Sequence, residues 1–543
     1  MNILFVLQYP GYLRYYDSVV HELANRGHRV AVAFSTETKQ REALIAVEAC
    51  DRITHIRRVP RRRDIWSPLA LFVRGLADYA RFLHPHYDRA SYLRRRHEKK
   101  YLPRRVASVT RRLPAQRPTA IRAVRRLIQE LEDAIPSSED HETYLKEADP
   151  DIVVVSPAVA RGDFTRQTDL LKSAHALGLP TAIGVASWDH LTTKGVIQIR
   201  PDRVIVWNEI QRREAEEFHY VPRSDVATTG AQPFDRWFDR RPTLDRASFC
   251  KRVGLPADRP FVTFLGSTAA ISKQTRKNLE KVFVREWVRA LRAANDEAVR
   301  TLSVLIRPHP FYFESWSDND LSDLENVILW PKHGANPVDE EDRNDYFHTL
   351  FHGAAAVGIN TTAMVEAAVV GTPVLTVRTP EFAHSQAGTV HFQYLLPENG
   401  GFVRLASSFD EHASQLAAVL NDPEAVAAEL TRFVGSFVRP RGLKQACTPL
   451  VVSEIEAVGS RTAHAKPKAS GASILRPLMW IVTAVLSLTY DERQKRAIKR
   501  AVVRRLRPCR VASGLHPRRG GNARAQGRRG RDQYAAREAS ADH

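Results

Sequence analysis

Short apolar runs and amphipathic stretches alternate along most of the chain. The runs NILFVL at 2–7, RVAVAF at 29–34, DIVVVS at 151–156 and FVTFL at 261–265 are rich in β-branched and aromatic residues, which predicts buried strands. Stretches with helical spacing of apolar residues separate them, and this alternation is typical of α/β domains. The pattern therefore predicts an α/β protein with two Rossmann-like domains that face a cleft, at 1–235 and 236–457.

An arginine-rich segment interrupts the first domain at 57–132. Helical patterns over Leu69–Leu83 and Ala120–Leu131 predict a basic helical insertion. Its apolar residues interleave with arginines, which suits a membrane interface, although the alternative is that they pack onto the domain. These residues are Trp66, Leu69, Leu71, Phe72, Tyr79 and Phe82.

The pattern changes again after residue 457. Residues 458–473 are rich in Ala, Lys and Ser, which predicts a linker. The apolar run Leu478–Leu488 is shorter than the roughly 20 residues that a membrane-spanning helix needs. Basic residues follow it, so 474–507 is predicted to associate with an anionic membrane surface. The Arg- and Gly-rich tail 508–543 is predicted to be disordered.

Net charge is concentrated in the same two places. The chain of 543 residues carries +20, yet 57–126 holds 21 basic against 4 acidic residues and 491–543 holds 16 against 5. The rest of the chain is therefore net acidic. Localised basic segments bind polyanions, and we expect anionic lipid rather than nucleic acid as the partner.

The cysteines and the N-terminus indicate the compartment. Four scattered cysteines without a paired spacing argue against a disulfide framework or a zinc site. The sequence begins MNILFVLQYP, an apolar run without a basic leader, which favours a first strand over a signal peptide. We expect a cytoplasmic protein that lies at the inner face of the membrane.

Polar residues follow predicted strands at several points, where open α/β sheets bind ligands. The loop SWDHLTTKG at 187–195 offers Asp189 or His190 as a general base, and Lys194 for a phosphate or an acidic acceptor. The alternative is that the Asp–His pair only caps the loop. In RPHP at 307–310, two prolines stiffen a loop that presents Arg307 and His309. Arginine binds phosphate, while His309 can hydrogen bond a phosphate oxygen or protonate a leaving group.

The stretch GINTTAMVEAAVVGTPVLTV at 358–377 predicts a strand, a helix and a second strand. Thr361 or Thr362 can cap the helix, whose free N–H groups suit phosphate. Glu366 can accept a hydrogen bond from a ribose hydroxyl, or it is a solvated helix residue. The candidate substrate-binding set also includes Asn360, the loop Gly266, Ser267 and Thr268, and the turn residue Gly11. No metal ligands are assigned, and GxGxxG is absent, which argues against a dinucleotide.

Together these motifs resemble the GT-B nucleotide-sugar glycosyltransferases and the related UDP-N-acetylglucosamine 2-epimerases. The motifs WDHLTTK at 188–194, RPHP at 307–310 and NTTAMVE at 360–366 are similar to those of the CDP-glycerol glycerophosphotransferase group. The resemblance covers roughly residues 1–455. WDHLTTK departs from that group by displacing the histidine and inserting Asp189. Glu366 stands where an Asp is expected and is closer to the ribose-binding Glu of glycosyltransferases.

The resemblance implies transfer of a sugar from a nucleotide-activated donor, with the donor in the second domain. The acceptor would be a glycan or a lipid-linked group of the cell envelope, held in the first domain. Asp189, His190 and His309 would be catalytic, and the donor would be a substrate, so no cofactor is expected. The alternatives are a CDP-glycerol-type glycerophosphotransferase, a nucleotide-sugar epimerase or a non-enzymatic basic adaptor.

Overall fold

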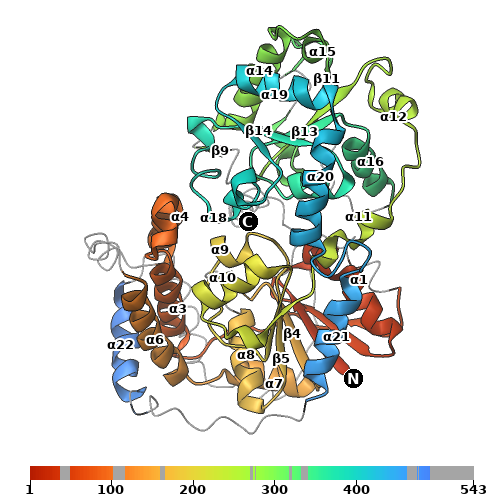
Figure 1. The fold of residues 1–543 in the computed structure, drawn as a ribbon. Coiled ribbons are helices and arrows are strands. Elements are labelled where there is room, and N and C mark those ends of the chain that lie inside the picture. The colour runs from red at the N-terminus through yellow and green to blue at the C-terminus, as the bar shows by residue number, and fades with distance from the viewer. Residues whose placement is uncertain are drawn as a thin grey trace, which may run out of the picture.

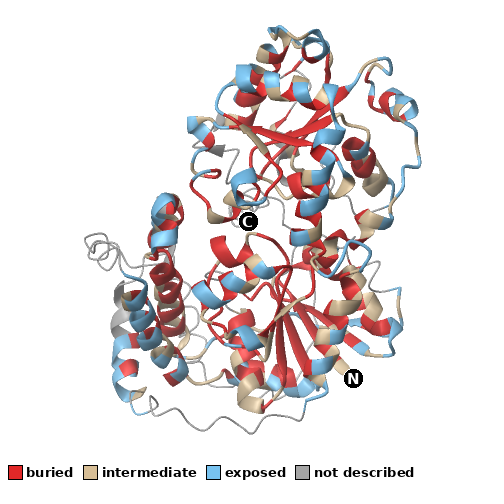
Figure 2. Ribbon diagram, viewed as in Figure 1, coloured by how far each residue is buried: buried red, intermediate tan, exposed pale blue. Residues whose placement is uncertain are grey.

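The computed structural model describes residues 1–36, 44, 49–101, 117–158, 166–268, 273–274, 277–316, 321–331, 340–461, 474 and 476–489. Two parallel sheets lie one above the other, each covered by helices on both faces (Figure 1). The strands of both sheets are buried, as Figure 2 shows in red. This arrangement confirms the predicted α/β class with two Rossmann-like units. Most of the linker predicted at 458–473, the whole basic stretch after Thr489 and the tail predicted at 508–543 lie outside the described residues.

The first sheet has the strand order β3-β2-β1-β4-β5-β6-β7, with every neighbouring pair parallel. Its strands are β1 (Asn2–Leu7), β2 (Arg29–Phe34), β3 (Ile53–His55), β4 (Ile152–Ser156), β5 (Thr181–Gly184), β6 (Arg203–Val206) and β7 (Val226–Thr228). The order reverses between β1 and β4, so a ligand crevice is expected at their carboxyl ends. The helices around this sheet include α1 (Leu13–Asn25), α7 (Glu139–Ala148), α8 (Arg166–Leu177), α9 (His190–Thr193) and α10 (Glu209–His219).

The second sheet has the order β12-β11-β8-β13-β14-β15, again parallel throughout. Its strands are β8 (Phe261–Leu265), β11 (Ser303–Arg307), β12 (Val327–Leu329), β13 (Ala355–Gly358), β14 (Val374–Val377) and β15 (Arg404–Ala406). The order reverses between β8 and β13. Its helices include α14 (Leu279–Arg292), α16 (Glu340–Phe351), α17 (Ala363–Val370), α18 (Val390–Gln393), α19 (Phe409–Asn421) and α20 (Glu424–Phe433).

The chain returns to the first sheet at α21 (Thr448–Gly459). Val452 and Ile455 of α21 are fully buried in the same apolar cluster as Phe5 of β1. The range 236–457 predicted for the second domain therefore includes a helix that packs on the first. Its apolar residues could not reveal which sheet they cover, because either sheet would bury them equally well.

Asp235, the last residue of the sequence GAQPFD at 230–235, holds the start of α21 in place. Its carboxylate accepts hydrogen bonds from the backbone amides of Cys447 and Thr448, at 3.0 and 2.7 Å, and pairs with Arg439 at 2.8 Å. Asp235 is itself buried. Buried carboxylates need such partners, so the motif near the domain junction acts as a structural anchor.

The arginine-rich insertion forms a helical layer beside the first sheet. Its helices are α3 (Ser67–Arg81), α4 (Ser91–Tyr101) and α6 (Pro118–Ala134), and the C-terminal α22 (Arg476–Thr489) packs against α3. Figure 1 shows α22 beside α3 and α6, although it is distant from them in sequence. Leu69, Tyr79 and Phe82 are buried, so the membrane-interface interpretation of these residues was wrong and they pack onto the domain.

Several arginines of the insertion are internal. Arg74 is buried and pairs with Glu132 at 2.8 Å and with Asp169 at 2.9 Å, while Arg62 pairs with Asp169 at 3.3 Å. Lys172 adds a contact to Glu132 at 3.2 Å. The local excess of positive charge thus overstates the charge available to a polyanion, because part of it holds the insertion to α8. Within the described part of the chain, no helix combines the length and apolarity needed to cross a bilayer.

Candidate active site

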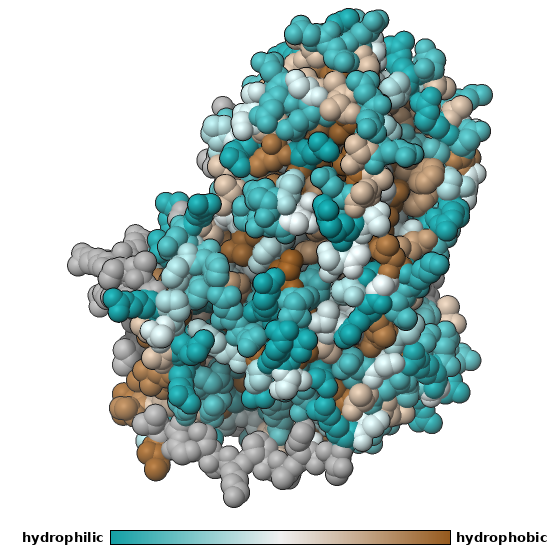
Figure 3. All heavy atoms as spheres, in the orientation of Figure 1, coloured by the Kyte–Doolittle hydropathy of each residue, from teal (hydrophilic) through white to brown (hydrophobic). Residues whose placement is uncertain are grey.

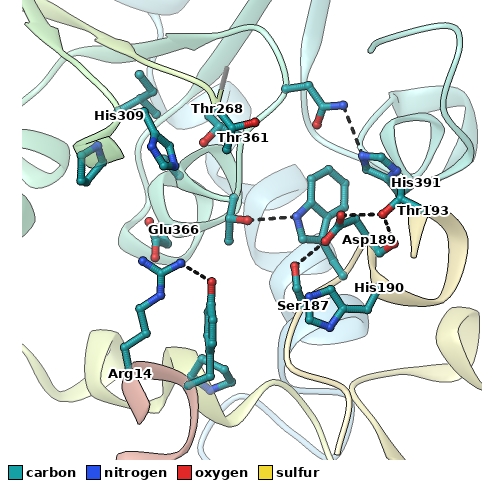
Figure 4. Close-up of a pocket in the computed structure, with 18 of the residues that line it drawn as sticks. Arg14, Ser187, Asp189, His190, Thr193, Thr268, His309, Thr361, Glu366 and His391 are labelled. Atoms are coloured by element: carbon teal, nitrogen blue, oxygen red, sulfur yellow. Dashed lines mark hydrogen bonds between the residues drawn. The ribbon is translucent and has the colours of Figure 1, made fainter. Parts of the chain in front are cut away.

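A cavity of about 400 Å³ lies between the two sheets, where their switch points face one another. It is lined from the first sheet by residues that follow β1 and β5, and from the second by residues that follow β8, β11 and β13. The carboxyl ends of parallel strands therefore converge on one space, as the topology predicts. Most of the candidate residues line it: Asp189, His190, Lys194, Gly266, Thr268, Arg307, His309, Asn360, Thr361, Thr362 and Glu366. Figure 4 shows Asp189 and His190 facing His309, Thr361 and Glu366 across it.

Asp189 lies just before α9, in the loop that follows β5. The hydroxyls of Ser187 and Thr193 donate to its two carboxylate oxygens at 2.7 and 2.8 Å. Burial favours the neutral acid, but Lys194, His190, His391 and the Ser187 hydrogen bond together hold the pKa of Asp189 well below its usual range. Asp189 is therefore a carboxylate at neutral pH, in a fixed orientation.

The insertion holds this loop in place. The Arg81 guanidinium, from the end of α3, donates to the carbonyl of Leu191 at 2.8 Å and to that of Lys194. Asp78 of the same helix accepts from the backbone amide of Val196 at 2.7 Å. Two buried charged residues of the insertion thus satisfy backbone groups of the loop. This gives the insertion a role in positioning the candidate bases.

Arg307 ends β11 and is the buried cation of the opposite wall. Its guanidinium lies 4.4 Å from the ring centre of Tyr346, and its Nη1 is buried without a hydrogen-bond partner. Burial lowers the pKa of Arg307 from its usual value, yet an arginine stays charged at neutral pH. A buried charge normally has an anionic partner. Arg307 therefore places an unpartnered N–H group of a buried cation on the cavity wall.

His309 is held close to the neighbouring loop by Gly266. The amide of Gly266 donates to the carbonyl of Arg307 at 2.8 Å, and a Cβ on Gly266 would lie 2.7 Å from the backbone nitrogen of His309. A glycine is needed for this approach. Burial, together with the nearby Arg14, lowers the pKa of His309 to about 3. The imidazole is thus neutral at neutral pH, which favours hydrogen bonding to phosphate over protonation of a leaving group.

The predicted cap of α17 differs from the observed one. Thr362 occupies the N-cap position, but its hydroxyl makes no capping hydrogen bond. It accepts instead from the indole N–H of Trp188 at 3.2 Å, across the cleft. The sequence could not predict this bond because Trp188 belongs to the other sheet. The first turn of α17 still faces the cavity through Thr361 and Ala363.

Glu366 lies on the inner side of α17 rather than in solvent. It accepts a hydrogen bond from the Tyr346 hydroxyl, and burial raises its pKa. Figure 4 shows Arg14, from the first domain, extending toward Glu366. The solvated-residue alternative is therefore excluded for this carboxyl, which lines the cavity.

Two candidates lie off the cavity lining. Ser267 is fully buried, and its backbone amide donates to Glu280 at 2.8 Å, beneath the loop. Gly11 lies in a short 3-10 turn whose neighbours Tyr9 and Tyr12 do line the cavity. Asn360 lines it while donating to the carbonyl of Ser385 at 2.5 Å. We expect Ser267 and Gly11 to shape their loops.

Sequence analysis missed several lining residues. His391 packs edge-on against Trp188, with ring centres 4.7 Å apart, and its Nδ1 is buried without a hydrogen-bond partner. Burial lowers its pKa to about 4. Tyr346 on α16 and Arg14 on α1 also line the cavity. These residues lie outside any motif and on helices, so the sequence offered no signal that they share one space.

Comparisons with known proteins leave the family unassigned. No family model matches the chain, and no curated protein matches it. The chain is similar to the solved structure of a glycosyltransferase from Rickettsia africae ESF-5, with a TM-score of 0.48 and 9% identity over 85% of this chain and 99% of that one. It is also similar to UDP-GlcNAc 2-epimerase from Neisseria meningitidis bound to UDP-GlcNAc, with a TM-score of 0.46 and 13% identity over 84% of this chain and 100% of that one. A third similar structure is that of a putative UDP-N-acetylglucosamine 2-epimerase from Listeria monocytogenes, with a TM-score of 0.47 and 11% identity over 86% of this chain and 98% of that one. Likenesses at this level leave the reaction of this chain open.

Proposed function

We propose that this protein is a transferase that moves a sugar from a nucleotide-activated donor to an acceptor hydroxyl. The observation that carries the proposal is Arg307, a buried guanidinium that lines the cavity and has an unpartnered Nη1. A diphosphate placed there would supply the missing anion and would also meet neutral His309. The amide of Ala363, the first residue of α17, would add a donor for the same phosphates, whereas the next three amides already donate to the carbonyls of Thr361 and Thr362.

The remaining walls fit the other parts of such a reaction. Glu366 would accept hydrogen bonds from the ribose of the donor. Asp189 or His190 would take the proton from the acceptor hydroxyl. The acceptor oxygen then bonds to the anomeric carbon, and the bond from that carbon to the diphosphate breaks with its electron pair. Arg307 and His309 would stabilise the negative charge that develops on the leaving nucleoside diphosphate.

Binding of nucleoside diphosphates tests the donor site. We expect at least one of UDP, CDP, GDP and ADP to raise the melting temperature of the wild-type protein. Arg307→Ala should weaken that binding about tenfold or more, since hydrogen bonds to charged groups contribute about 1.5–3 kcal/mol. Arg289→Ala is the matched control, because Arg289 is an exposed arginine of the same domain. Equal binding by wild type and Arg307→Ala would overturn the assignment.

Turnover separates the classes of enzyme. A transferase releases the nucleoside diphosphate from its nucleotide sugar only when an acceptor glycan or lipid-linked acceptor is present. A changed sugar or free sugar without any acceptor would indicate an epimerase or a hydrolase instead. Turnover of CDP-glycerol in place of a nucleotide sugar would indicate a glycerophosphotransferase.

A further inference from the structure

Exposed apolar side chains gather at one corner of the molecule. Eleven large apolar side chains are exposed within the described residues, and seven of them belong to α6, to α22 and to Ile474, which lies two residues before α22. These seven are Val124, Leu127, Ile474, Leu478, Trp480, Ile481 and Val482. Figure 3 shows apolar side chains at the lower left, where Figure 1 draws α22. Scattered exposed apolar residues are ordinary, but a group of this kind marks an interaction surface.

The helix α22 is fixed by one face and exposed by the other. Met479 and Thr483 are buried, and Met479 belongs to the apolar cluster of α3 and α6. The Arg476 Nε donates to the carbonyl of Ala134, at the end of α6, at 3.0 Å. Leu478 and Ile481 are three residues apart and lie on the other side of the helix, where both are more than half exposed.

The helix α6 continues this surface. Ile121 and Ile128 face inward, whereas Val124 is 47% and Leu127 is 65% exposed. Arg122 and Arg126 are exposed beside them. The acids Glu130 and Asp133 lie further along the helix, toward its C-terminus. The N-terminal half of α6 therefore presents apolar and basic side chains together.

We propose that Val124 and Leu127 of α6 and Leu478, Ile481 and Val482 of α22 form one docking face for an anionic lipid bilayer. Apolar side chains flanked by arginines suit the boundary between acyl chains and anionic headgroups. The chain that follows α22 adds charge of the same sign, with 16 basic against 5 acidic residues over 491–543. At 14 residues, α22 is too short to span a bilayer and would lie along it.

This inference holds whichever reaction the cleft performs, yet it connects to the cleft. The helix α3 contacts both α6 and α22. It ends at Arg81, whose guanidinium donates to the 187–195 loop of the first domain. The next helix, α4, contributes Leu93 and Arg96 to the cavity lining. One helical layer thus links the docking face to the cavity where an acceptor would bind.

Vesicle co-sedimentation of the full chain tests the docking face. The probes are phosphatidylcholine vesicles with and without phosphatidylglycerol. Leu127→Glu and Ile481→Glu should each reduce partitioning onto the anionic vesicles about tenfold. Each removes an apolar side chain that would be buried in the bilayer and adds a negative charge that the anionic headgroups repel. Val282→Glu is the matched control, since Val282 is similarly exposed on α14 of the other domain, and it should bind as the wild type does. All three side chains are exposed, so the melting temperature should be unchanged.

Leu127→Glu is the decisive variant. If the basic sequence after Thr489 binds membranes by itself, Leu127→Glu will sediment like the wild type, and the proposed face is wrong. Equal binding to vesicles without phosphatidylglycerol would overturn the anionic preference. A wild-type dimer that Leu127→Glu dissociates would show that the face binds a second copy of the chain instead of lipid.

Discussion

The two candidate bases, Asp189 and His190, are neighbours in sequence but lie in different surroundings. Asp189 is buried among hydroxyl donors and cations that keep it ionised, with a pKa well below the usual range of a carboxyl. His190 is also buried, at the start of α9, with its ring parallel to that of Tyr12 and 6.2 Å away. A carboxylate and an imidazole have different ordinary pKa values, so the pH dependence of the reaction distinguishes the two candidate bases.

We expect Asp189→Asn to lower kcat by about 10²–10⁴-fold while nucleoside diphosphate binding changes little, since general bases contribute factors of this size. If Asp189 is the base, kcat/KM should show no acidic limb even at about pH 4, where an ordinary aspartate titrates, because the pKa of Asp189 is held below that range. An acidic limb near pH 6–7 that disappears in His190→Gln would assign the role to His190. Asp258→Asn, at an exposed aspartate, is the control and should have wild-type kinetics.

Glu214 of α10 is a buried carboxyl whose raised pKa affects the stability of the protein. Burial raises its pKa to about 8 from a usual value of 4.5. The folded protein then keeps a proton that the unfolded chain loses above pH 4.5. The free energy of unfolding should therefore fall as pH rises from about 4.5 to about 8 and then level off.

Glu214→Gln should reduce this pH dependence. The variant removes a group that costs up to about 5 kcal/mol at pH 8, at about 1.4 kcal/mol for each unit of pKa, so it should melt at a higher temperature than the wild type at that pH. Melting temperatures from pH 5 to about 8.5 measure the effect. Glu216→Gln, at an exposed position of the same helix, should leave the wild-type slope in place. A parallel slope in Glu214→Gln would show that Glu214 is ionised when folded.

At the scale of elements, the candidate phosphate site depends on two loops that touch. The loop after β8 and the RPHP loop after β11 meet at Gly266, whose missing side chain allows the contact with His309. The sequence suggested Gly266 as a glycine for close approach of a ligand. In the structure, its first close neighbour is the backbone of the adjacent loop.

Gly266→Ala should therefore act on donor binding. The added methyl group would push the backbone of His309 away from the cavity, and we expect nucleoside diphosphate affinity to fall about tenfold, as for loss of one charged hydrogen bond. Isothermal titration measures the change. Gly435→Ala is the control, because a Cβ there meets nothing nearer than 3.8 Å. Unchanged affinity in Gly266→Ala would mean that the RPHP loop position does not control binding.

At the scale of the whole molecule, the two domains meet through the candidate base loop. Trp188 precedes Asp189 and donates across the cleft to Thr362 of the second domain. It also packs against His391 from the same domain. Trp188 therefore connects the loop that carries Asp189 to the second domain.

Trp188→Phe keeps an aromatic ring but removes the indole N–H. We expect kcat to fall about tenfold, with a smaller change in the Kd of the nucleoside diphosphate, because Trp188 positions the base rather than the donor. Steady-state kinetics and titration of the same preparation separate the two effects. Trp287→Phe is the control for loss of an indole, because Trp287 is buried, donates to His412 at 3.0 Å and does not line the cavity. Equal losses of kcat and of affinity would indicate a general structural defect.

The sequence by itself determined the fold class and several of the loops that line the cavity. Buried strands need continuous apolar residues, and ligand-binding loops follow them, so RPHP, WDHLTTK and NTTAMVE could be placed from pattern alone. The same local pattern also located the basic insertion and the helices within it.

Tertiary structure decided what depends on distant partners. It placed α21 on the first sheet, buried the arginines of the insertion beside Glu132 and Asp169, and brought His391, Tyr346 and Arg14 to the cavity. It also set α22 beside α6, where Arg476 donates to the carbonyl of Ala134, 342 positions away. Apolar and charged side chains specify that they need partners, but only packing selects which partners they meet.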